Sequence, residues 1–129
     1  ATHTTFAYNI LQGGGAAAKI EGPYTDAIWK GNLLWGTLDD ADLPPAGYAS
    51  ADPLLAVGPD GIKRLQAGSP AMGAAEDFTA VIVDFDGQPR PAKKAVGADE
   101  LSTEPVVSGL LTVQDVGPLA KLRETPPPP

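Results

Sequence analysis

The residues with the clearest capacity for chemistry are two acids and a basic residue around position 85. Asp84 and Asp86 flank Phe85, and Arg90 follows. Two carboxylates on the same side of an extended segment could hold calcium or act as an acid and a base. Asp86-Gly87 is also a turn dipeptide, and a neighbouring carboxylate such as that of Asp84 commonly accepts backbone N–H bonds. We favour the turn.

Arg90 also has two possible partners. It could pair bidentately with a glycan carboxylate, helped by Lys93-Lys94, or it could bridge to Asp84, Asp99 or Glu100. The chain has 9 Lys+Arg against 16 Asp+Glu and a formal charge of −7, so it has no general attraction for polyanions. We expect a structural ion pair.

The candidate substrate-binding residues are Tyr24, Lys30 and Trp35. An outward-facing aromatic side chain can stack on a sugar ring, and a nearby Lys can meet a uronate carboxylate. The alternative is that the loop 39–52 covers Trp35, since large aromatics are usually mostly buried. That loop contains four Asp residues but matches no EF-hand spacing, so we assign no metal ligand and no catalytic residue in this chain.

Composition limits the elements that can position these residues. The 129 residues include 15 Gly and 14 Pro, which interrupt long helices, and 43% hydrophobic residues, which argue against a disordered chain. The negative charge argues against a basic nucleic-acid binder, and no apolar run is long enough for a membrane span. The absence of Cys excludes disulfides and thiolate metal sites. We expect one domain, secreted or periplasmic.

The first third of the chain contains an internal repeat. Residues 6–13 (FAYNILQG) align with residues 29–36 (WKGNLLWG), so that an aromatic, an Asn, two aliphatics and a Gly coincide. The pattern predicts a short strand, a bend at Asn9 or Asn32, a second short strand and a Gly-rich loop. This is typical of one rung of a parallel β-solenoid, and we place the rungs at about residues 3–38.

The strand period of two predicts which side chains face inward. We expect Phe6 over Trp29 and Leu11 over Leu34 inside the coil, with Ile10, Leu33 and Trp35 pointing outward. Stacked Asn9 and Asn32 are expected to hydrogen-bond from one level to the next. Phe6, Ile10 and Leu11 are expected at an exposed edge unless another segment covers them.

The remainder of the chain has weaker signals. We predict, in order, a loop at 39–52, a turn at 59–61, a strand at 79–85, short elements at 96–100 and 110–113, one helical turn at 119–123 and a disordered polyproline tail at 126–129.

Several short motifs from Asp52 to Glu100 resemble the C-terminal end of secreted right-handed parallel β-helix proteins. They are 52–55 (DPLL), 64–65 (RL), 68–71 (GSPA), 84–90 (DFDGQPR) and 96–100 (VGADE). With 30–36 (KGNLLWG) and 110–118 (LLTVQDVGP), the chain is similar to the polysaccharide lyase family of chondroitinase B and related alginate lyases. The resemblance implies an all-β chain: the last rungs of a right-handed parallel β-helix within residues 1–125, followed by an irregular C-terminal end structure at about 52–118.

The resemblance also implies an activity. In that family calcium neutralises a uronate carboxylate, a Lys removes the adjacent proton and an Arg assists the leaving oxygen, in a β-elimination. The family carries these groups on an Asn, a Glu-x-Glu pair, a Lys and an Arg of central rungs. This chain contains no Glu-x-Glu, so calcium is expected in the complete family enzyme and no cofactor in this chain.

Two functions follow as hypotheses. The first is the C-terminal fragment or subunit of a calcium-dependent lyase of uronate polysaccharides, which completes the solenoid and lines the glycan groove. The second is a non-enzymatic β-helical carbohydrate-binding or assembly module. The expected partners are upstream β-helix rungs, on the same or another chain, and an acidic polysaccharide, with no nucleic acid and no membrane.

Overall fold

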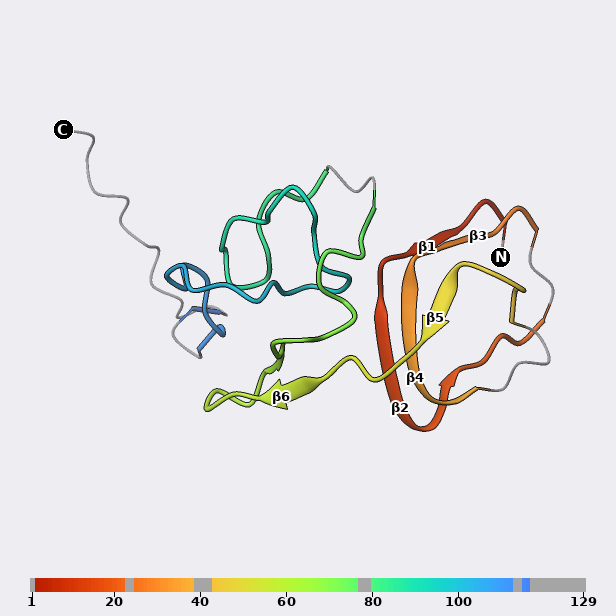
Figure 1. Ribbon diagram of the computed structural model, residues 1–129, viewed down its shortest axis with the longest axis horizontal. Helices are drawn as coiled ribbons and strands as arrows, with labels where there is room; N and C mark the ends of the chain where they lie inside the picture. Colours follow the sequence, from red (N-terminus) through yellow and green to blue (C-terminus); the bar gives the residue numbers. More distant parts are fainter. Residues whose placement is uncertain (1, 23–24, 39–42, 77–79, 113–114, 117–129) are drawn as a thin grey trace.

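The computed structural model describes residues 2–22, 25–38, 43–76, 80–112 and 115–116, and these residues form an all-β chain without a helix. Figure 1 shows β1 to β5 gathered at one end of the molecule, while the chain after residue 65 loops irregularly at the other end. The strands are β1 Thr5–Ala7, β2 Ile10–Ala18, β3 Ile28–Lys30, β4 Asn32–Leu38, β5 Tyr48–Ser50, β6 Leu55–Val57 and β7 Lys63–Leu65. No helix among these residues is long and apolar enough to cross a membrane.

The two copies of the repeat pair in parallel, in the register that their alignment predicts. In β1 and β3, Phe6 lies opposite Trp29, and in β2 and β4, Leu11 lies opposite Leu34. The Gly-rich residues 13–15 belong to β2 rather than to a loop, although the register shifts between Gln12 and Ala16. The strand–bend–strand interpretation is therefore confirmed, and the predicted end of the second strand was too early.

A third level of strand follows the two repeats. Tyr48–Ser50 forms β5, which pairs in parallel with β4, so the prediction of a loop over 39–52 is wrong for these residues. Asn32 lies opposite Tyr48 rather than opposite a third Asn, and the chain between these two levels is shorter than between the first two. Because β5 carries no third copy of the repeated motif, the repeat in the sequence did not predict this strand. Residues 39–42 of the predicted loop lie outside the described residues.

Aromatic and aliphatic side chains stack from level to level, as predicted. The ring centroids of Phe6 and Trp29 are 4.8 Å apart, and Tyr48 adds an edge contact to Trp29 at 6.4 Å. Leu34 is fully buried, and Asn32 in the bend is 2% exposed. The strands of the two copies are therefore joined by side-chain packing as well as by backbone pairing.

The outward aliphatics Ile10 and Leu33 belong to the main hydrophobic core rather than to a solvated surface. Leu33 is 4% exposed and clusters with Leu65 and Val96, and Ile10 packs against the same cluster. The amide of Gly97 donates to the carbonyl of Tyr8 at 2.9 Å, which fixes the later segment beside the bend. The second half of the chain thus covers the outer face of the first.

The turn at residues 59–61 is confirmed and closes a hairpin that the sequence did not predict. β6 and β7 pair antiparallel, with Leu55 opposite Leu65. The amide of Gly61 donates to the carbonyl of Gly58, and the amide of Gly58 donates to that of Ile62, so both ends of the turn are hydrogen-bonded. The hairpin places Leu65 in the core and Arg64 beside the turn.

The strand predicted over 79–85 is wrong for the described residues 80–85. Only an isolated antiparallel bridge between Val83 and Pro89 forms there, flanked by bonds from the amide of Asp84 to Gln88 and from the amide of Arg90 to Ile82. The amide of Phe85 bonds instead to the carbonyl of Ala98, in a separate loop. Its apolar side chains stay exposed, with Ile82 at 70%.

The short elements predicted at 96–100 and 110–112 have no regular secondary structure. Residue 113, the helical turn predicted at 119–123 and the polyproline tail at 126–129 lie outside the described residues.

Candidate functional site

Two of the three predicted glycan-binding residues, Lys30 and Trp35, lie on strands of different sheets. Lys30 ends β3, and its Nζ lies 5.8 Å from the ring centroid of Tyr8, in a cation–π contact that the sequence did not indicate. Trp35 lies on β4 in the other parallel sheet and is 41% exposed, so much of its ring surface reaches solvent. Tyr24 lies outside the described residues.

Arg90 forms the structural ion pair predicted for it, and its partner is Glu100. Nη1 of Arg90 is 2.9 Å from Oε1 of Glu100, and only 5% and 7% of the two side chains are exposed. The guanidinium also donates to the carbonyls of Ala95 and Gly97, which satisfies a charge that would otherwise be costly to bury. Arg90 is therefore committed to the fold and is not positioned to bind a glycan carboxylate.

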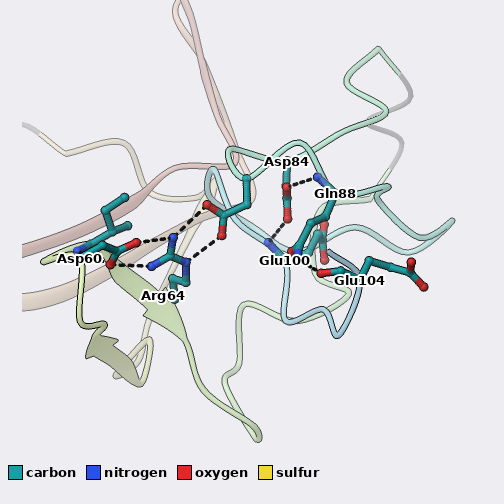
Figure 2. A network of polar contacts seen from close by, with 8 residues as sticks. Asp60, Arg64, Asp84, Gln88, Glu100 and Glu104 are labelled. Carbon is teal, nitrogen blue, oxygen red and sulfur yellow. Dashed lines mark hydrogen bonds and ion pairs between the residues drawn. The ribbon is translucent and has the colours of Figure 1, made fainter. Parts of the chain in front are cut away.

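Asp84 also acts as a structural residue, because both of its carboxylate oxygens accept backbone amides. Oδ1 accepts from Gln88 at 2.8 Å and Oδ2 from Glu100 at 3.2 Å, as Figure 2 shows. The Gln88 side chain in turn donates to the carbonyl of Glu104. These bonds confirm the turn interpretation and join segments near residues 84, 100 and 104.

Asp86 is neutralised by Arg64, a partner contributed by β7. Nε and Nη2 of Arg64 reach the two carboxylate oxygens of Asp86 at 2.8 and 2.9 Å, and Nη1 reaches Asp60 at 2.9 Å. This guanidinium holds the pKa of Asp86 and that of Asp60 below their ordinary values. The sequence did not pair Arg64 with Asp86, because the chain between them follows an irregular path.

The described residues offer no calcium site. No group of three or more acidic or His side chains among them is arranged to hold a metal ion. Asp52, the described Asp of the predicted loop, uses Oδ1 to accept the amide of Leu54 at 2.9 Å. The carboxylates of Asp84, Asp86 and Glu100 are likewise occupied by amides or guanidinium groups, which does not suit the oxygen-rich shell that calcium requires.

A cleft of about 840 Å³ is available for binding in the described structure. It lies between one edge of the first repeat and the segment 81–99. Its volume falls in the range of about 300–1,000 Å³ found for ligand sites. The apolar part of its lining is formed by Phe6, Ile10, Leu11, Leu55, Leu65, Val81, Val83, Phe85 and Val96, and the polar part includes Asn9, Lys63, Asp84, Arg90 and Asp99.

Asp99 is the least satisfied acid in the wall of this cleft. Both of its carboxylate oxygens are buried without a hydrogen-bond partner of good geometry among the described residues. This burial raises the pKa of Asp99, and the negative charges of Asp84 and Asp86 raise it further. The positive charge of Arg64 and the backbone of Leu65 offset the shift only in part. The sequence offers Asp99 as a possible partner of Arg90, and its isolation arises only in the fold.

Comparison with protein-family models, with curated proteins and with solved structures finds no match to this chain.

Proposed function

We propose that this chain forms the C-terminal portion of a right-handed parallel β-helix, comprising its last rungs and an irregular end structure. The observation that carries the proposal is the parallel pairing of the two repeats, with Asn9 bonded to Asn32 at their bends. Repeats of this size cannot bury a hydrophobic face alone and need neighbouring levels for stability. The second half of the chain covers the outer face of these levels.

The activity proposed for the complete protein is β-elimination of a uronate-containing polysaccharide of the alginate or dermatan/chondroitin type, in a secreted or periplasmic setting. The order of motifs from residue 52 to residue 100 supports this assignment through its resemblance to the lyase family. The described residues contain no group of three or more His, Asp or Glu side chains arranged to hold a metal ion, and the sequence contains no Glu-x-Glu. The role that we assign to this chain is to complete the solenoid and to present Trp35 and Lys30 to the glycan.

Oligosaccharide titration tests the binding role. Calorimetry with alginate and dermatan sulfate oligosaccharides is expected to show binding that Trp35→Ala weakens about tenfold, because a stacking platform is lost. Ile82→Ala removes a side chain that is 70% exposed elsewhere and serves as the matched control with unchanged affinity. Equal affinity of the wild type and of Trp35→Ala would show that Trp35 does not contact the glycan.

A lyase assay tests the assignment of the catalytic groups to other rungs. The chain alone is expected to release no unsaturated uronate from alginate or dermatan sulfate, with or without calcium. Turnover by the purified chain would show that it holds a catalytic site of its own, contrary to the proposal.

The second candidate function is a non-enzymatic binding or assembly module. The observation that favours it is the cleft beside the strand edge, whose lining is mainly apolar. Self-association in size-exclusion chromatography, together with absence of glycan binding, would favour the module over the lyase portion.

A further inference from the structure

The first repeat presents one strand edge without a partner among the described strands. β1 pairs only with β3, and β2 is at the end of the order β2-β4-β5. The carbonyl of Thr4 accepts from Ile28 and the amide of Tyr8 donates to Lys30, so even-numbered residues of this stretch bond to β3. Because alternate residues of a strand direct their backbone groups to opposite sides, Thr5 and Ala7 direct theirs to the free edge.

The free edge continues along β2, after the bend at Asn9. The carbonyl of Asn9 accepts the amide of Leu33 at 2.8 Å, which assigns Asn9 and Leu11 to the β4 side of the ladder. Ile10 and Gln12 therefore direct their amides to the free edge. An edge of this kind is a ready template for another strand.

The ladder of Asn side chains has a direction. The backbone amide and Nδ2 of Asn9 both donate to Oδ1 of Asn32, at 3.1 and 3.0 Å. Nδ2 of Asn32 donates onward to the carbonyls of Phe6 and Gly47, at 2.8 and 3.2 Å. In this ladder the side-chain oxygen of Asn32 therefore accepts hydrogen bonds from Asn9, which lies one level earlier in the chain.

Because each Asn donates to the next level, Oδ1 of Asn9, at the free edge, is available as an acceptor. Nδ2 of Asn9 donates to Asn32 and to the carbonyl of Ala7, but Oδ1 of Asn9 accepts no hydrogen bond within the described part of the chain. Asn9 lines the cleft, together with the free edge of both strands. A preceding strand with an Asn at the equivalent place would supply the missing donors.

The cleft opposite this edge favours a neutral strand over an acidic glycan. Its wall contains the apolar side chains of Val81, Val83 and Phe85, which the segment 80–85 leaves exposed. Among the charged groups in the wall, Arg90 is paired with Glu100, Asp84 accepts two amides, and Asp99 is a further acid. Lys63 is exposed at this wall. The peptide backbone and apolar side chains of a strand complement such a surface, whereas a polyuronate would bring several negative charges to a wall whose other cation, Arg90, is already paired.

We propose that this cleft binds an extended polypeptide segment as a parallel strand, with an aromatic side chain over Phe6, an Asn whose amides donate to Asn9 Oδ1, and an aliphatic side chain over Leu11. The inference rests on the β-helix part of the proposed function and not on its lyase activity. The partner is thus a segment with the same repeat chemistry, in the same direction and register as β1 and β2.

A tandem chain tests this proposal directly. A copy of residues 1–23 joined ahead of Ala1 places its own Phe, Asn and Leu one repeat before Phe6, Asn9 and Leu11. Hydrogen exchange measured by NMR is expected to slow about tenfold or more at the amides that face the free edge, which are those of Thr5, Ala7, Ile10 and Gln12. A copy of scrambled sequence but identical composition is the control, and it is expected to leave these amides unchanged.

A second variant of the tandem chain tests the proposed hydrogen bond from the Asn of the added copy to Asn9. Replacing the Asn of the added copy by Leu removes the donors to Asn9 and is expected to reduce the added protection at Ile10 about threefold to tenfold, the effect of one or two hydrogen bonds. Equal protection with Asn and with Leu would overturn the assignment of Asn9 as an acceptor. Unchanged exchange in the tandem chain, with the rest of the fold intact, would overturn the strand-binding proposal as a whole.

A substitution in the original chain gives an independent measurement. Ala7→Pro removes an amide hydrogen that faces the free edge, so a tandem chain carrying it is expected to lose the added protection at Thr5 and Ile10. Ser50→Pro is the matched control, because Ala51 bonds to β4 and the neighbouring Ser50 therefore faces away from it. Protection that survives Ala7→Pro as well as Ser50→Pro would contradict pairing at this edge. Neither measurement depends on a glycan, so failure here is separable from failure of the lyase assignment.

Discussion

Nη1 of Arg90 lies 2.9 Å from Oε1 of Glu100, and this ion pair joins two segments that have no regular secondary structure. The same carboxylate oxygen accepts the amide of Ala95 at 2.8 Å, while the guanidinium holds the carbonyl of Gly97. Gly97 in turn donates its amide to Tyr8 in the first repeat. The pair therefore links the irregular end structure to the parallel strands.

Replacing Glu100 by Gln is expected to lower the free energy of unfolding by about 3 kcal/mol, because it leaves the buried Arg90 without its counter-charge. Urea denaturation measures this change. Glu21→Gln is the control, since its pair with Lys19 leaves 78% and 53% of the two side chains exposed. An exposed pair contributes below about 1 kcal/mol. A loss at Glu100 no larger than that at Glu21 would contradict the structural role of the pair.

Asp99 is expected to make stability fall as the pH rises. Its pKa is raised in the folded protein, chiefly by burial, so the folded state holds the proton more tightly than the unfolded state. Its contribution is full below the ordinary Asp value of about 3.9 and is lost as the pH rises through the raised folded-state value. Asp99→Asn removes the charge, so it is expected to stabilise the protein by about 1 kcal/mol at pH 7 and to have little effect near pH 3.

Thermal unfolding across this pH range measures the difference between Asp99→Asn and the wild type. Glu76→Gln removes an acid at an exposed position and is the matched control. A stabilisation by Asp99→Asn that is the same at pH 3 and at pH 7 would show that the effect does not arise from titration of Asp99.

Asn32 is expected to be the more sensitive member of the Asn ladder. It is 2% exposed, and its side chain joins Asn9, Phe6 and Gly47. Asn32→Leu removes these bonds, so a loss of about 2 kcal/mol is expected in urea denaturation. Gln12→Leu, at an exposed position of β2, is expected to change stability by about 0.5 kcal/mol or less. Comparable losses for both substitutions would argue against a special role of the ladder.

Gly47 is expected to tolerate no side chain. A Cβ there would lie 2.3 Å from the carbonyl oxygen of Trp29, and the residue has a φ of +98°. Gly47→Ala is therefore expected to cost about 3 kcal/mol or more, since both the backbone angle and the contact oppose it. Gly14→Ala, where a Cβ meets nothing within 4 Å, is expected to stay within about 0.5 kcal/mol. Circular dichroism melting curves separate these outcomes.

The local and repetitive features of this protein could be predicted from its amino-acid sequence. An aromatic, an Asn and two aliphatics recur in the same order in residues 6–13 and 29–36, and this was sufficient to predict the parallel register of β1 with β3 and of β2 with β4. The turn at 59–61 and the turn role of Asp84 could also be predicted, because Pro, Asp and Gly impose their backbone preferences over only a few residues. Parity along each strand correctly indicated that Leu34 is buried.

The meeting of distant segments, by contrast, depends on the tertiary fold. The fold places Ile10 and Leu33 in the core, pairs Arg64 with Asp86, isolates Asp99 beside a cleft and leaves the β-prone residues 81–85 without a ladder. Local propensity favours a strand there, but a strand also needs a partner strand, and the described structure provides only the single bridge between Val83 and Pro89. The outward side of a strand is solvated or buried according to what packs against it, and here that depends on segments far along an irregular chain.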